Sequence, residues 1–305
     1  MRRISRHYLQ SNSWKHLRNH FHNELGFDES VSADGSLRLV GHISRERRRR
    51  SFLHNYVLEA FFGPYQISSG NSPIVSKETI DYIMAIALRL NTHLIRLHSY
   101  KDTDFAYVTL SEFSSILQED KIPFIEHCSS TLIYNLLEHE FNSLDACSAS
   151  VRKNLRKASE IKIVRASEPV QIAEFFRQLS LLKGKRAPRN REVEAYQNWR
   201  EGCILFLAYD ANYERCLGTL GFVHDNHLAT EIASSTAKGV GARGVQEKLH
   251  LACFDQAKEI GLEKFDLAGL ERNFDGEWNT ISKFKLKFGG EITSNGFIEI
   301  DVQKS

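Results

Sequence analysis

The second half of the chain alternates between apolar runs typical of strands and apolar residues at helical spacing. A short β-branched run, IKIVR (161–165), predicts a strand, and Ile172, Phe175 and Phe176 then lie on one face of a predicted helix. A further helix is expected near 191–201. Three apolar runs separated by turn residues follow and predict an antiparallel meander, at 203–209, 216–223 and 227–235.

A long amphipathic helix is predicted after this meander. Its apolar side carries Val245, Leu249, Cys253 and Ile260, and Gly261 is placed to cap its C-terminal end. The remaining predicted elements are a strand at 264–269, a short helix at 278–286 and closing strands at 290–300. Strand, helix, helix, three antiparallel strands, helix, strand, helix, strand is the order of a GCN5-related N-acetyltransferase (GNAT) domain.

The first half of the chain repeats the later part of this order. A helix around Trp14 leads to predicted strands at 36–43 and 51–62. The helix predicted at 78–90 places apolar residues on one face, namely Ile80, Ile83, Met84, Ala87 and Leu88. The last predicted elements are a strand at 93–99, a short helix at 111–117 and a strand at 123–128.

The repetition predicts an α/β (α+β) protein of two tandem GNAT-like domains, each a mostly antiparallel twisted sheet flanked by helices. We expect a first domain at 1–146 and a second at 147–305, with the last strands able to pack back on the first domain. The length of 305 residues is sufficient for two ordinary cores.

Composition narrows the function classes. The first residues, MRRISRHYLQ, lack the apolar segment of a signal peptide or membrane anchor, so we expect a cytoplasmic protein without integral membrane association. The 5 cysteines form no C-x-x-C pair, and the 13 histidines show no metal-ligand spacing. We therefore expect neither a disulfide framework nor a metal site.

Positive charge is local, because the net charge of the whole chain is only +2. One cluster is RERRRR (45–50), and another contains Arg152, Lys153 and Arg156 on a predicted helix. Each cluster has two interpretations. It is either a solvated helix or strand face, or a binding surface for a phosphate-rich partner such as transfer RNA, which gains affinity from counterion release.

One stretch near the C-terminus, FDLAGLERNFDGEWNTISKFKLKFGGEI (265–292), resembles the Fem-type aminoacyltransferases. These enzymes add amino acids from aminoacyl-tRNA to peptidoglycan precursors. The family pattern is a strand ending in D-x-G-G, a variable loop and then F-K-x-x-F-G. The matching residues are Asp266, Gly269, Phe284, Lys285, Phe288 and Gly289, with Ala268 in place of the first glycine.

Weaker similarities to the same family extend over most of the chain. Trp14 and Arg18 stand in the place of a W-x-x-x-K motif, and Arg191 falls where the family has an arginine that contacts the nucleotide-linked acceptor. The resemblance implies that Trp14, Arg18, Arg191 and Tyr196 bind the acceptor. It also implies two GNAT-like units with the acceptor between them, of the compact type without a coiled-coil arm.

The resemblance gives Lys285 a catalytic role. Aminolysis of an ester requires positive charge or hydrogen-bond donors at the developing oxyanion, and the Lys285 ammonium suits that task if Phe284 and Phe288 pack inward. The alternative is an ordinary surface lysine. Asp266 either orients the substrate amine or acts as a base, or it caps the loop that follows the strand.

A competing donor site precedes the long helix. Lys238, Gly239, Gly241 and Arg243 form a glycine-rich loop of the kind whose backbone amides hold the pyrophosphate of acetyl-CoA in GNAT enzymes. The leading interpretation is an aminoacyl-tRNA-dependent transferase that forms an amide on a peptide or small-molecule amine, without a cofactor. The alternatives are an acyl-CoA-dependent N-acyltransferase and a non-catalytic module that binds RNA or another anion.

Overall fold

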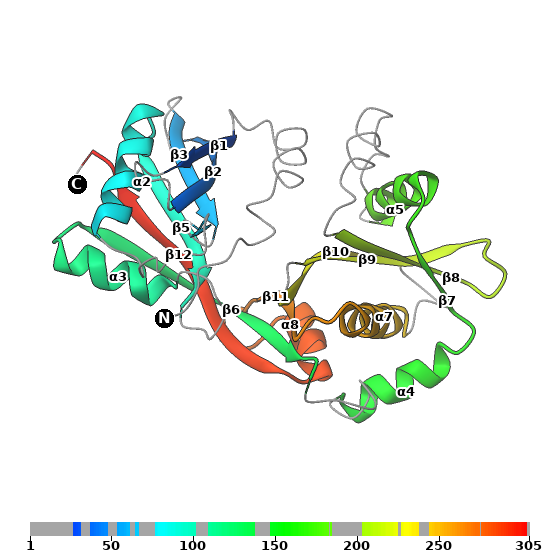
Figure 1. Ribbon diagram of the computed structural model, residues 1–305. Helices are drawn as coiled ribbons and strands as arrows, with labels where there is room; N and C mark the ends of the chain where they lie inside the picture. Colours follow the sequence, from blue (N-terminus) through cyan, green and yellow to red (C-terminus); the bar gives the residue numbers. More distant parts are fainter. Residues whose placement is uncertain are drawn as a thin grey trace. The chain divides into compact units, whose positions relative to one another are not determined.

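The computed structural model describes part of the chain as an α/β structure (Figure 1). The described residues are 27–31, 37–47, 54–61, 65–66, 77–101, 109–137, 147–182, 184, 203–224, 227–237, 244–274 and 276–303. The strands form one sheet in the order β1-β2-β3-β5-β12-β6-β11-β10-β9-β8-β7, and β4 pairs with β2. The predicted α/β class is confirmed. The expectation of a separate sheet for each domain is wrong, because the described strands form one sheet.

The bounds of the strands agree with most of the predicted apolar runs. The strands are β1 (Phe27–Val31), β2 (Leu37–Arg47), β3 (His54–Phe61), β4 (Tyr65–Gln66), β5 (Leu94–Tyr100), β6 (Phe124–Asn135), β7 (Lys162–Arg165), β8 (Cys203–Tyr209), β9 (Cys216–His224), β10 (Leu228–Thr236), β11 (Lys264–Leu270) and β12 (Glu291–Asp301). Neighbours are mostly antiparallel, but β3 pairs with β5 and β10 with β11 in parallel.

The helices lie at the predicted positions wherever the structure describes them. They are α2 (Lys77–Arg89), α3 (Leu110–Glu119), α4 (Ala149–Lys157), α5 (Pro169–Leu182), α7 (Val245–Glu259) and α8 (Thr280–Lys285), followed by the 3-10 helix η2 (Leu286–Phe288). The helix expected near 191–201 lies outside the described residues. Among the described helices, none has the length and hydropathy needed to cross a membrane.

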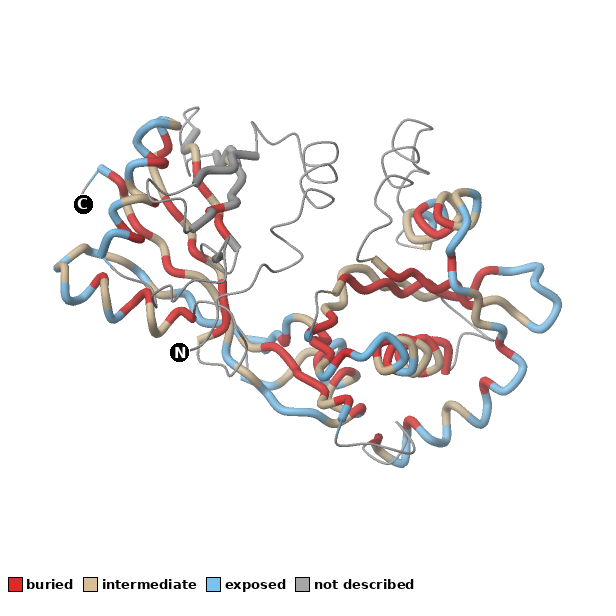
Figure 2. The backbone as a smooth tube through the Cα atoms, in the orientation of Figure 1, coloured by how far each residue is buried: buried red, intermediate tan, exposed pale blue. Residues whose placement is uncertain are grey.

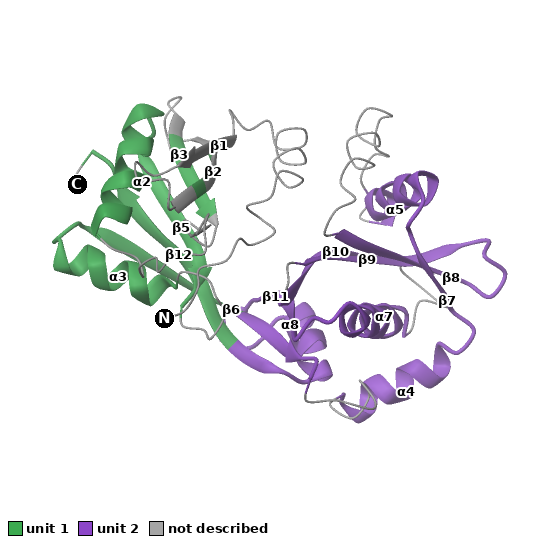
Figure 3. Cartoon of the chain, viewed as in Figure 1, with its two compact units in different colours: residues 1–130, 293–305 green, residues 131–292 purple. Residues whose placement is uncertain are grey.

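The chain divides into two compact units (Figure 3). Unit 1 comprises Met1–Ser130 and Thr293–Ser305, and unit 2 comprises Thr131–Ile292. The chain passes from one unit to the other inside β6 and returns inside β12. The strand predicted at 123–128 is therefore only the first part of a longer one. The domain boundary expected at 146/147 stays a prediction.

The core of unit 1 combines residues from distant parts of the sequence. Residues of α2 and α3 pack with β5 and with Ile298 and Ile300 of β12, and both isoleucines are fully or almost fully buried. Figure 2 colours the buried residues of the described chain red. The predicted apolar face of α2 is partly wrong. Leu88 is 64% exposed, whereas Ile86 is buried, because the core side of the helix is rotated toward Thr79 and Ile86.

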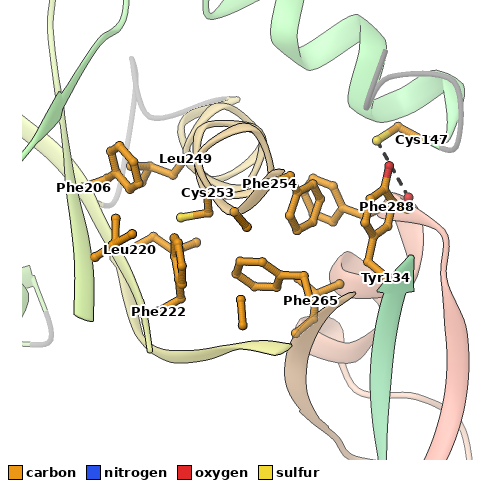
Figure 4. Close-up of a cluster of buried hydrophobic side chains, with 14 of the residues drawn as sticks. Tyr134, Cys147, Phe206, Leu220, Phe222, Leu249, Cys253, Phe254, Phe265 and Phe288 are labelled. Atoms are coloured by element: carbon orange, nitrogen blue, oxygen red, sulfur yellow. Dashed lines mark hydrogen bonds between the residues drawn. The ribbon is translucent and has the colours of Figure 1, made fainter. Parts of the chain in front are cut away.

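Aromatic rings dominate the core of unit 2 (Figure 4). Tyr134 of β6 stacks on Phe254 of α7 with ring centroids 4.5 Å apart, and Phe254 also packs against Phe265 and Phe288. Cys253 and Leu249 are buried on the same side of α7, as predicted. Ile260 is 40% exposed because α7 has ended one residue earlier, and Gly261 follows it in the left-handed conformation.

The start of α7 is fixed against α4. Gly244, the N-cap residue, has a φ of +83°, and a Cβ atom there would lie 2.5 Å from the carbonyl oxygen of Asn154. The Asn154 side chain donates to Glu247 at 2.6 Å, and Lys248 donates to the Ile161 carbonyl at 2.7 Å. Glycine is thus required both by the backbone conformation and by the close approach of α4.

Candidate functional site

A pocket of about 350 Å³ lies within unit 2. Its walls come from the second half of β10, the first half of α7 and helix α8. This volume is at the small end of the range for ligand sites, and suits a small acyl or aminoacyl group. The residues that matter for its chemistry are Glu231, Ser235, Gln246, His250, Phe284 and Lys285.

Lys285 is turned into the protein, unlike its lysine neighbours. It is 9% exposed, lines the pocket and donates from Nζ to the carbonyl oxygens of Ala268 at 3.3 Å and Gly269 at 3.1 Å. Lys283 instead forms an exposed ion pair with Glu277, and Lys287 is exposed. The first turn of α8 is capped by the Asn279 side chain, which accepts from the Ser282 amide and fixes the helix that carries Lys285.

The end of β11 supplies the carbonyl groups that Lys285 contacts. Asp266 is 4% exposed, and its Oδ1 accepts from the Ala268 amide at 2.7 Å and from the Thr131 hydroxyl. Ala268 has a φ of +61°, a conformation that favours glycine, and it stands at the position where the Fem-type pattern has glycine. These contacts support the interpretation of Asp266 as the residue that caps and fixes this turn.

Glu231 and His250 form a buried pair in the wall of the pocket. Their side chains are 8% and 3% exposed, and His250 Nε2 lies 3.3 Å from Glu231 Oε2. The other ring nitrogen, Nδ1, lies 2.7 Å from the Gln246 backbone carbonyl, which can only accept, so Nδ1 carries a hydrogen. A second hydrogen must then lie between Nε2 and the carboxylate, since two acceptors would otherwise face each other.

The surroundings of Glu231 favour its ionised form. Burial by itself raises the pKa of this carboxyl group, but the hydrogen bond from His250 and the charges of His250 and Lys285 outweigh burial and lower the pKa below its ordinary value of 4.5. Glu231 therefore presents an ionised carboxylate to the His250 ring.

The two phenylalanines of the Fem-like stretch pack inward as expected. Phe288 is fully buried, and His250 stacks on it with centroids 4.7 Å apart. Phe284 is half-buried, packs edge-on to His250 at 5.6 Å and lines the pocket. These rings form the apolar part of the site and hold the imidazole in place.

Sequence reasoning missed Glu231, His250, Gln246 and Ser235 as site residues. One signal was present, because Glu231 is a charged residue inside the otherwise weakly polar run HLATEIASS. A carboxylate in a half-buried strand requires a hydrogen-bond or ion-pair partner, and such buried charged pairs are frequent at functional sites. The partner itself, His250 on the following helix, has no comparable local signal.

The structure describes only some of the other predicted site residues. Gly269 is exposed at the end of β11. On α4, Lys153 and Arg156 are exposed, whereas Arg152 donates from Nη1 to the Cys147 carbonyl. The predicted residues that lie outside the described part of the chain are Trp14, Arg18, Arg191, Tyr196, Lys238, Gly239, Gly241 and Arg243.

Solved structures resemble the chain over most of its length. FemX is similar with a TM-score of 0.68 at 12% identity, covering 97% of this chain and 92% of its own. L-PGS from Bacillus licheniformis gives a TM-score of 0.59 at 12% identity, with coverages of 92% and 85%. A tandem GNAT protein from the clavulanic acid biosynthesis pathway gives 0.57 at 10% identity, with coverages of 92% and 84%.

Comparisons of sequence add nothing to this likeness, since neither a protein-family model nor a curated protein matches the chain. Identities of 10% and 12% are evidence for the fold alone. The chain therefore has a GNAT-like α/β fold of the kind found in FemX and L-PGS.

Proposed function

We propose that this protein is an aminoacyltransferase that takes an aminoacyl group from aminoacyl-tRNA and joins it to an amine. The observation that carries the proposal is the placement of Lys285, which is buried at the wall of a pocket with its ammonium held by two carbonyl groups. The resemblance of 265–292 to the Fem-type pattern and the likeness to the FemX fold support it.

The chemistry follows from the charge of the site. A neutral amine attacks the ester carbonyl, the C–N bond forms and the C–O bond to the ribose breaks, and the amine proton passes to the leaving ribose oxygen. Negative charge develops on the carbonyl oxygen, and the Lys285 ammonium lines this pocket. Two of its three N–H bonds reach the Ala268 and Gly269 carbonyls, so one remains for the oxyanion, a contribution of about 3 kcal/mol.

The remaining residues receive supporting roles under this proposal. Asp266 fixes the turn at the end of β11 and thereby positions Lys285. The acceptor's anionic groups bind the guanidinium groups of Arg18 and Arg191, and Trp14 and Tyr196 also bind the acceptor, as the Fem-type resemblance implies. Helix α4 binds the phosphates of the tRNA through its exposed cations, chiefly Lys153 and Arg156, while Arg152 also stabilises the helix start.

An acyl-CoA-dependent N-acyltransferase is the second candidate. One observation favours it, because residues of the first turns of α7 line the same pocket, and the glycine-rich stretch with Lys238, Gly239, Gly241 and Arg243 directly precedes that helix. A helix start with free amide groups is suited to a pyrophosphate. The acceptor chemistry would be unchanged, since both donors present an activated carbonyl.

The test supplies each donor separately to the purified protein with a mixture of amines and follows product mass. Charged tRNA is expected to yield an amide, and ribonuclease treatment is expected to abolish it. Amide formed from acyl-CoA without RNA would replace the proposal with the second candidate. RNA binding without turnover from either donor would indicate a non-catalytic binding module.

A further inference from the structure

Two buried polar atoms in the wall of the pocket lack a hydrogen-bond partner within the described part of the chain. They are Gln246 Oε1 on α7 and Ser235 Oγ on β10. Buried oxygens of this kind are usually paired, because an unpaired one costs about 1–3 kcal/mol. Both belong to a pocket, so a bound molecule is the natural partner.

The orientation of the Gln246 amide is fixed by its other end. Gln246 Nε2 donates at 2.8 Å to the backbone carbonyl of Ser235, which can only accept. The nitrogen must therefore face β10, and the oxygen is the unpaired atom. The same contact holds Gln246 next to Ser235, so the two unpaired oxygens belong to one hydrogen-bonded unit.

The chemistry of these atoms defines the group that they bind. Gln246 Oε1 only accepts, so the group must donate a hydrogen to it, and the Ser235 hydroxyl is able to accept a second hydrogen. An amino group has enough N–H bonds to donate to both oxygens, whereas a plain acyl chain has none. Oε2 of Glu231, which also lines the pocket, faces His250.

We propose that Gln246 and Ser235 bind an amino group of the substrate close to the carbonyl that Lys285 polarises. This pair would make the pocket specific for amino-bearing substrates over plain acyl groups. The inference rests on the proposed function for the position of the carbonyl. The amino group comes either from the aminoacyl donor, as its α-amino group, or from the acceptor amine.

The test is direct binding, measured by calorimetry on the full chain without tRNA. The probes are the amides of the 20 standard amino acids, their des-amino counterparts and simple alkyl amines. At least one amino-acid amide is expected to bind, and its des-amino counterpart about tenfold or more weakly. An alkyl amine that binds as well would assign the site to the acceptor amine. Failure of alkyl amines to bind would assign it to the α-amino group.

Variants separate this specificity from folding. Ser235→Ala removes only the hydroxyl, and Gln246→Met removes the amide at nearly constant volume. Both are expected to reduce the preference for the amino-bearing probe about tenfold. Gln256→Met is the matched control on α7, because Gln256 pairs with Glu259 rather than with the pocket. Circular dichroism checks that each variant is folded.

Three outcomes would overturn the inference: equal binding of a des-amino probe by the wild type, no binding by any probe, or an unchanged preference in both pocket variants. Because binding needs neither tRNA nor turnover, its result is independent of the donor assay. Loss of amide formation with intact probe discrimination would remove the proposed function and leave the amino-group site standing.

Discussion

Lys285 donates from Nζ to the carbonyl oxygen of Ala268, and Ala268 in turn donates its own amide hydrogen to Asp266. A lysine, a strained turn and a buried carboxylate thus form one hydrogen-bonded chain. These hydrogen bonds link the two ends of the Fem-like stretch, the D-x-x-G turn and the F-K helix. The position of the ammonium is therefore set by the backbone at the end of β11.

Replacing this ammonium should remove most of the activity. Lys285→Met is expected to lower kcat for amide formation by about 10²–10³-fold, because a preorganised donor at the oxyanion is lost. Lys283→Met and Lys287→Met are the controls, since both lysines are exposed, and should stay within about twofold of wild type. Equal losses in all three variants would contradict the assignment of Lys285.

The left-handed residue at the end of β11 offers a gain in stability. Ala268→Gly should raise the free energy of unfolding by about 0.5–1 kcal/mol, because glycine adopts a φ of +61° without the Cβ clash but loses more chain entropy. The expected rise in melting temperature, measured by calorimetry, is roughly 2 °C. A lower melting temperature would show that alanine is not strained at this turn.

Two glycines with the same φ should differ in their tolerance of a side chain. Gly244 and Gly261 both have a φ of +83°, but a Cβ at Gly244 would lie 2.5 Å from the Asn154 carbonyl, whereas Gly261 has nothing within 4 Å. Gly261→Ala should cost about 1 kcal/mol of stability. Gly244→Ala should cost at least about twice as much, because α4 or α7 must shift. Urea unfolding of both variants provides the comparison.

The buried Glu231 predicts a specific loss of stability in acid. Its pKa lies below the ordinary 4.5 despite burial, because of the hydrogen bond from His250 and the charges of His250 and Lys285. A depressed carboxyl pKa stabilises the fold above pH 4.5, and this stabilisation disappears as the pH falls through the lower folded-state pKa. As the pH falls from 4.5 through the folded-state pKa, the free energy of unfolding of the wild type should therefore decrease more steeply than that of Glu231→Gln. Parallel curves would contradict the ionised pair.

Helix α4 should contribute to RNA binding through charge alone. Lys153→Ser and Arg156→Ser should each reduce the slope of log affinity against log salt by about 0.7 to 0.9, since each removes one phosphate contact. Lys77→Ser is the control, because this lysine is exposed but pairs with Asp120 of unit 1. Filter binding or anisotropy over a salt series measures the slopes. Unchanged slopes in both variants would place the RNA elsewhere.

Most strands and helices were predictable from the sequence, because the apolar pattern that specifies each one lies within its own residues. The apolar runs at 203–209 and 216–223 became β8 and β9, and Gly261 follows α7 as its spacing indicated. The predicted apolar faces of two helices were wrong at their C-terminal ends, since Leu88 and Ile260 lie outside the core. In both cases the last turn is oriented by tertiary packing, which the periodicity of a single helix does not contain.

The chemistry of the site was predictable only in part. Lys285 and Asp266 were found through a family-like stretch, and their placement at the end of β11 agrees with it. The Glu231–His250 pair and the amide of Gln246 were not found, because contacts between β10 and α7 depend on how that helix crosses the strands. Such pairings are set by the whole core and leave no spacing rule in the sequence.

The return of β12 to unit 1 has a genetic consequence. Ile298, Ile300 and Val302 pack in the core with α2, α3 and β5, although the whole of unit 2 lies between these segments in the sequence. A premature stop codon that removes Thr293–Ser305 would thus damage the half of the protein encoded first. Unit 1 is therefore not encoded by one continuous segment of the gene, because its two parts lie on both sides of the segment that encodes unit 2.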